Sequence, residues 1–168
     1  MPKAPHRTKP TPSLQAQLPE LREGQSVELL QELHILTREG KLNQDTRRKL
    51  KQVYHLVQFI EPLLQEVLDA RGDVSLADHG AGKSYLGFIL YDLFFKSKPV
   101  GWVFGVEARS ELVEKSQALA QRLGFDRMRF LATTVQQALS HEDLPPTFDV
   151  VTACLLYTSP SPRDLSTS

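Results

Sequence analysis

The chain has 168 residues, which suits one domain of ordinary size and is too short for two comfortable ones. Apolar residues make up 40% of the sequence and charged residues 24%, a balance that supports a packed core and excludes both global disorder and a membrane bundle. The 20 basic and 20 acidic residues cancel, so the net charge does not indicate a nucleic-acid partner, although it does not exclude one.

Residues 1–24 form a basic segment that holds five of the 11 prolines and few large apolar side chains. Such a segment cannot bury enough surface to offset the entropy of ordering, so we expect a disordered tail. It lacks the apolar stretch of a secretory signal, and no later apolar run reaches the roughly 18–20 residues of a spanning helix. We therefore expect a cytoplasmic protein with no membrane partner. The single cysteine, Cys154, excludes a disulfide framework and a cysteine-cluster zinc site, so no metal is expected.

Residues 25–72 predict a helical N-terminal extension. Ser26 is a candidate N-cap for a first helix, which Gly40 ends. A second helix begins at about 43–45 and carries apolar residues at helical spacing. Pro62 either breaks this helix or opens a third one that runs to the end of the region.

From residue 73 onward, short apolar strands alternate with amphipathic helices. Strands are predicted over 74–78, 102–107 and 128–131, with a fourth over 148–153, and helices over 86–94, 111–123 and 135–139. This alternation predicts an α/β fold, with about four parallel strands covered by helices on both faces. We expect no internal repeat.

The stretch from Leu76 to Leu86 carries the chemistry, because it lies where the first strand passes into a helix. Open α/β sheets bind ligands at this carboxyl edge. Gly80 and Gly82 remove Cβ atoms that would keep a ligand from the backbone, and the helix that follows begins with unpaired N–H groups. Asp78, at the end of the strand, can accept a hydrogen bond from a ligand.

Two nucleotide-site patterns fit this stretch poorly. A phosphate-binding loop needs G-x-x-x-x-G-K-[ST], but Ala77 stands at its first glycine and the loop is too short. A dinucleotide fingerprint needs G-x-G-x-x-G, and the bulky Tyr85 stands at its third glycine.

The same stretch resembles motif I of class I S-adenosylmethionine-dependent methyltransferases, in the branch that reads D-x-G-A-G-K-G-Y-L. The matching residues are Asp78, Gly80, Ala81, Gly82, Lys83, Tyr85 and Leu86. Ser84 replaces the last glycine of that pattern. The resemblance implies an incomplete Rossmann-like class I sheet with S-adenosylmethionine as cofactor. It also implies that the glycine turn passes beneath the methionine part of the cofactor and that Asp78 contacts this end.

Glu107 ends the second predicted strand, where the family's motif II carboxylate binds the two ribose hydroxyls. Nicotinamide enzymes place a carboxylate similarly, so Glu107 indicates cofactor binding without choosing the cofactor. We expect His79 to be a loop filler or cofactor neighbour and not a base, and we assign no catalytic residue. The resemblance implies a cofactor-binding set of Asp78, His79, Gly80, Ala81, Gly82, Ser84, Tyr85, Glu107, Ala108 and Thr133.

The end of the chain departs from the family pattern. Residues from Cys154 to Asp164 agree at every position with one reading frame of a common transposon-type sequencing adapter. We therefore expect 154–168 to be a non-native tail and 73–153 to be the cofactor-binding half of a methyltransferase domain. On this interpretation the chain is an N-terminal fragment that is inactive by itself.

The resulting hypothesis is methyl transfer from S-adenosylmethionine to an unidentified acceptor, which is an RNA, a protein or a small molecule. Two alternatives stay open. One is an NAD(P)-dependent Rossmann oxidoreductase, and the other is a non-catalytic module that keeps the cofactor pocket.

Overall fold

The computed structural model describes residues 18–82 and 84–153. The predicted adapter-like tail over 154–168 lies outside the described residues, as do 1–17 of the predicted N-terminal tail. The remainder of that tail differs from the prediction, because Leu18 and Leu21 are buried in the main core. These two leucines lie at the two ends of a turn and bury apolar area in the core.

Helix α2 (Val27–Glu32) begins as predicted, because the Ser26 side chain accepts a hydrogen bond from the Leu29 N–H. It ends at Glu32 and not at Gly40. His34 adopts a left-handed backbone (φ 56°), which turns the chain so that Ile35 remains buried outside the helix.

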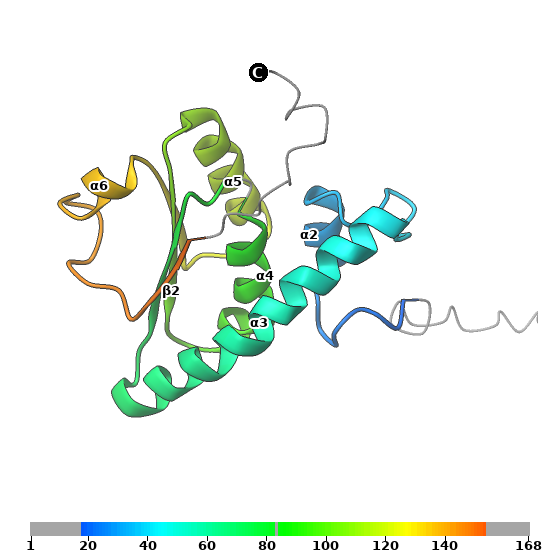
Figure 1. Cartoon of the computed structure of the whole chain (residues 1–168), viewed down its shortest axis with the longest axis horizontal. Helices are drawn as coiled ribbons and strands as arrows, with labels where there is room; N and C mark the ends of the chain where they lie inside the picture. Colours follow the sequence, from blue (N-terminus) through cyan, green and yellow to red (C-terminus); the bar gives the residue numbers. More distant parts are fainter. Residues whose placement is uncertain (1–17, 83, 154–168) are drawn as a thin grey trace, which may run out of the picture.

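Helix α3 (Gln44–Arg71) is continuous, and the predicted break at Pro62 is wrong. Asn43 and Thr46 form a reciprocal capping box at its start. Pro62 is exposed, so water can bond the backbone carbonyl that loses its helical partner, while buried Val57 and Leu64 hold the helix against the core on either side. Figure 1 shows α3 running across the whole molecule.

The remaining elements form the α/β part, and the predicted fold class is confirmed. The strands are β1 (Ser75–His79), β2 (Trp102–Glu107), β3 (Met128–Ala132) and β4 (Val150–Ala153), and the helices are α4 (Tyr85–Leu93), the 3₁₀ turn η1 (Phe95–Ser97), α5 (Ser110–Arg122) and α6 (Val135–Ala138). The four strands pair in parallel in the order β3-β2-β1-β4.

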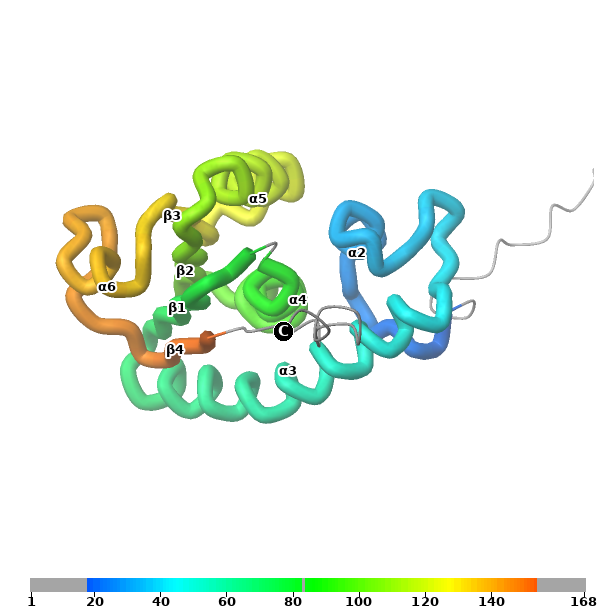
Figure 2. The backbone as a smooth tube through the Cα atoms, turned by 45° about the horizontal axis from the view of Figure 1, so that its top comes forward, coloured from blue at the N-terminus to red at the C-terminus, as the bar shows by residue number. Residues whose placement is uncertain are grey.

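Helices cover the two faces of the sheet unequally. Figure 2 shows α4 and α5 on one side of the row of strands and α6 on the other. The α4–α5 side holds the main core, in which Phe88 stacks on Phe130. The α6 side holds a smaller cluster around Phe104, and there Trp102 is 40% exposed. None of the described helices is long and apolar enough to cross a membrane.

Candidate cofactor-binding site

Most of the sequence-predicted site residues lie at the carboxyl edge of the sheet, where the strand order reverses. The chain passes from β1 to β2 to β3 in one direction, and β4 then returns to the other side of β1. Such a switch point separates the loops that follow neighbouring strands, and open α/β sheets bind ligands there. In the register of β1 and β2, His79 lies beside Val106, so the glycine turn and Glu107 are neighbours in space.

The glycine turn is held against β2 by its own backbone. The Ala81 N–H donates to the Val106 carbonyl at 3.1 Å. Gly80 (φ +63°) and Gly82 (φ +54°) both adopt left-handed backbone, and a Cβ built on Gly80 would meet no atom of the described residues within 4 Å. The turn therefore needs glycine for its conformation, and Gly80 borders open space.

Ser84 follows this turn in the same left-handed conformation, with φ 56° and ψ 31°. Its side chain is buried, and its Oγ has no hydrogen-bond partner among the described residues. A glycine would adopt this backbone without strain. That is a physical reason for the glycine at this position in the motif that the sequence resembles.

The carboxylate of Glu107 joins the end of β2 to the glycine turn. Its Oε2 accepts from the Gly82 N–H at 2.8 Å. Its Oε1 accepts from the Arg109 N–H at 3.2 Å and from Arg109 Nε at 2.8 Å. The bond from the Arg109 side chain lowers the pKa of Glu107 most, the two backbone N–H donors lower it further, and burial opposes them. The carboxylate is therefore held charged.

Asp78 lies below this edge and is only 1% exposed. Its Oδ1 accepts from Thr152 Oγ1 of β4 at 3.0 Å. A Cβ on Gly87 would come within 3.6 Å of its Oδ2, so Asp78 lies against α4. Thr152 is not predicted from the sequence, because only the return of β4 beside β1 brings it to Asp78.

The remaining predicted residues divide into two groups. Ala108 is exposed directly after Glu107, and the buried Thr133 donates its N–H to the Glu107 carbonyl at 3.1 Å. His79 packs edge-on against Phe148, and desolvation lowers its pKa. These three residues lie at the carboxyl edge.

Tyr85 has surroundings unlike those of the other predicted site residues. It lines a cavity of about 390 Å³ bordered by residues of α4 and α5 and by His34, just after α2. Burial raises the pKa of its hydroxyl. Its side chain packs against the main core.

Comparisons with known proteins give a family and several similar structures. Residues 48–155 match a family model described as a methyltransferase domain. No curated protein sequence matches the chain.

Three similar solved structures are the YcgJ protein from Bacillus subtilis, the C-terminal domain of precorrin-6Y C5,15-methyltransferase from Rhodobacter capsulatus, and magnesium protoporphyrin IX methyltransferase from Synechocystis with bound SAH. Their sequence identities to this chain are 25%, 25% and 16%, with TM-scores of 0.37, 0.35 and 0.47. The matches cover 54%, 50% and 74% of this chain. The chain spans 36%, 44% and 52% of those structures, respectively.

Proposed function

We propose that this chain, which belongs to a family of methyltransferase domains, binds S-adenosylmethionine at the carboxyl edge of its sheet. The bound cofactor would serve methyl transfer to an acceptor. The carboxylate of Glu107 is the observation that carries this proposal. It is charged, mostly buried and held at the glycine turn by the Gly82 N–H. The family match does not favour the nicotinamide-dependent oxidoreductase.

The residues at this edge fit the chemical groups of the cofactor. A ribose presents two neighbouring hydroxyl donors, and a carboxylate presents two oxygens with about four acceptor positions. A Cβ built on Gly80 would meet no atom of the described residues within 4 Å, which leaves room for a ligand at the glycine turn. The buried Ser84 Oγ adds a polar atom that has no partner among the described residues.

Each residue then has a defined part in holding the cofactor. Glu107 would accept the ribose hydroxyls, and Gly80 and Gly82 would let the backbone approach the ligand. Asp78, bonded to Thr152, would hold β1 and β4 together below the site. When bound, the cofactor supplies an activated methyl group on a sulfonium, so the contribution of the protein is mainly orientation and exclusion of water.

Titration calorimetry tests the proposal with S-adenosylmethionine, S-adenosylhomocysteine and NAD on the 168-residue chain. We expect saturable binding of the first two ligands and far weaker binding of NAD. Glu107→Ala should weaken binding by about 1–3 kcal/mol, because it removes a charge-assisted acceptor. Glu114→Ala, an exposed glutamate on α5, is the control and should bind normally. Saturable NAD binding with no response to S-adenosylmethionine would support the oxidoreductase instead.

We also propose that the motif belongs to the D-x-G-A-G-K-G-Y-L branch and that residues 154–168 are not part of the natural protein. Agreement between Cys154–Asp164 and an adapter reading frame supports the second point. Amplifying the gene from its source across the codon for Ala153 tests it. A continued α/β sequence is the expected result, and recovery of Cys-Leu-Leu-Tyr-Thr-Ser codons from genomic DNA would refute it.

A further inference from the structure

The guanidinium of Arg109 lies on the carboxylate that the proposed function assigns to the ribose. Its Nε donates to Glu107 Oε1 at 2.8 Å. Its Nη2 would be 3.7 Å from a Cβ built on Gly82, so the side chain also extends over the glycine turn. The Arg109 side chain is 66% exposed, whereas that of Glu107 is 9% exposed. An exposed cation therefore lies on a mostly buried anion.

The hydrogen-bond donors around Glu107 would compete with the hydroxyls of a ribose for its carboxylate oxygens. Three N–H groups already occupy three of the about four acceptor positions of the carboxylate. A vicinal diol brings two more donors, so one of the three N–H groups has to leave.

The backbone donors are the harder two to remove. The Gly82 N–H belongs to the turn that the Ala81–Val106 bond holds against β2. The Arg109 N–H belongs to the N-cap residue of α5. The guanidinium makes no side-chain cap bond to that helix, so it can leave without unwinding it.

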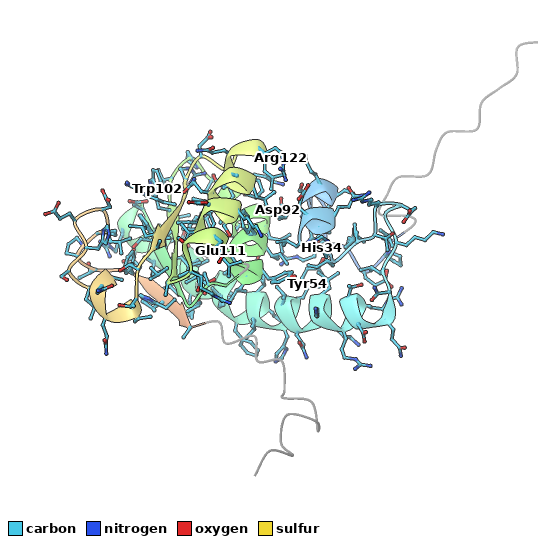
Figure 3. All side chains as sticks on the ribbon, turned by 90° about the horizontal axis from the view of Figure 1, so that it is seen from above. His34, Tyr54, Asp92, Trp102, Glu111 and Arg122 are labelled. Atoms are coloured by element: carbon cyan, nitrogen blue, oxygen red, sulfur yellow. The ribbon has the colours of Figure 1, made fainter. Side chains whose placement is uncertain are left out.

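We infer that Arg109 competes with the ribose of the cofactor for Oε1 of Glu107 and thereby sets the affinity of the site. This inference rests on the proposed function. The bond to Glu107 raises the pKa of Arg109 most, and the charge of Glu111, in the first turn of α5, raises it further. Glu111 is labelled in Figure 3 near the start of that helix.

The test is calorimetric titration of S-adenosylhomocysteine into the wild-type 168-residue chain, Arg109→Met and Arg122→Met. Methionine keeps the unbranched stem of the side chain and removes the guanidinium. Arg122 is the matched control, because it lies at the far end of α5, its side chain is 53% exposed, and it pairs with Glu32 of α2. Thermal melts by circular dichroism check that all three proteins are folded.

Arg109→Met should bind the ligand about two- to fivefold more tightly than wild type, the range expected for an exposed ion pair. This advantage should shrink as ionic strength rises from about 0.05 to 0.5 M, because salt screens the pair that it removes. Arg122→Met should bind as wild type does.

The other outcomes separate the inference from the proposed function. Equal affinity of wild type and Arg109→Met would overturn the inference alone, and weaker binding by Arg109→Met would show that the guanidinium contacts the ligand. Binding by Arg109→Met but not by wild type would support the inference in its strongest form. If none of the folded proteins binds, the proposed function fails and the inference fails with it.

Discussion

The carboxylate of Asp92, on α4, accepts a hydrogen bond at 2.8 Å from the backbone N–H of Ser26, the N-cap of α2. The Asp92 side chain is fully buried, and its second oxygen pairs with Lys96. Lys96 Nζ in turn donates to the Gly24 carbonyl at 3.0 Å. Figure 3 shows Asp92 where α4 meets α2. These bonds tie the N-terminal extension to the helix that packs on the sheet, so the two parts are expected to unfold together.

Asp92→Ala should lower the free energy of unfolding by about 2–3 kcal/mol, because it leaves the Ser26 N–H without its acceptor and removes a charge-assisted bond. Urea denaturation followed by circular dichroism measures this change. The control is Asp69→Ala, whose carboxylate is exposed on α3 and should change stability little. Equal small effects of both substitutions would contradict a tie between the extension and α4.

Ser84→Gly should stabilise the protein by about 0.5–1 kcal/mol, since it relieves a left-handed serine but adds freedom to the unfolded chain. It also removes a buried hydroxyl that has no partner among the described residues. The direction in which the urea midpoint shifts shows whether the substitution stabilises or destabilises the protein. Ser116→Gly, in the middle of α5, is the control and should destabilise, because glycine is a poor helix former. A loss of stability in Ser84→Gly would mean that the hydroxyl has a structural role.

Gly80→Ala should both destabilise the protein and weaken cofactor binding. The strain comes from its positive φ and costs about 1–2 kcal/mol. Gly72→Ala is a matched control, because Gly72 has φ +73° and open space around its Cβ position but ends α3 away from the site. Both variants should lose similar stability in urea, and Gly80→Ala alone should lose affinity for S-adenosylhomocysteine. If both variants lost affinity equally, the loss would result from their lower stability and not from a change at the site.

The Glu107 carboxylate should make stability depend on pH in the acidic range. Its bonds to Arg109 and Gly82 hold its pKa in the folded protein below the ordinary value of 4.5. A lowered pKa means that the charged form stabilises the fold above pH 4.5, and that this stabilisation is lost as the pH falls through the folded-state pKa. Glu107→Gln should therefore be less stable than wild type near neutral pH, and the difference should shrink on acidification. Urea midpoints across this range measure it, and a difference that grows in acid would contradict the assignment.

Local sequence signals predicted the fold class and the approximate positions of the four strands. The strand over 102–107 is predicted and observed with the same bounds, Ser26 caps the helix for which it is the candidate N-cap, and the second helix begins within the predicted range of 43–45. These features depend on side chains within one turn or on alternation within one strand, so the local sequence is enough to predict them. The glycine turn and Glu107 follow from the same reasoning, because the carboxyl ends of adjacent parallel strands share one edge.

The tertiary structure alone decided which distant groups contact these residues. The continuity of α3 through Pro62 depends on water on one side and buried leucine and valine on the other. Thr152 reaches Asp78 because β4 pairs with β1 and not with β3, a choice that depends on the packing of the whole sheet. Arg109 is close to Glu107 in sequence, but its bond to the carboxylate depends on the conformation of a side chain that is mostly exposed to solvent. Such contacts depend on free energies summed over several elements, so a local pattern does not specify them.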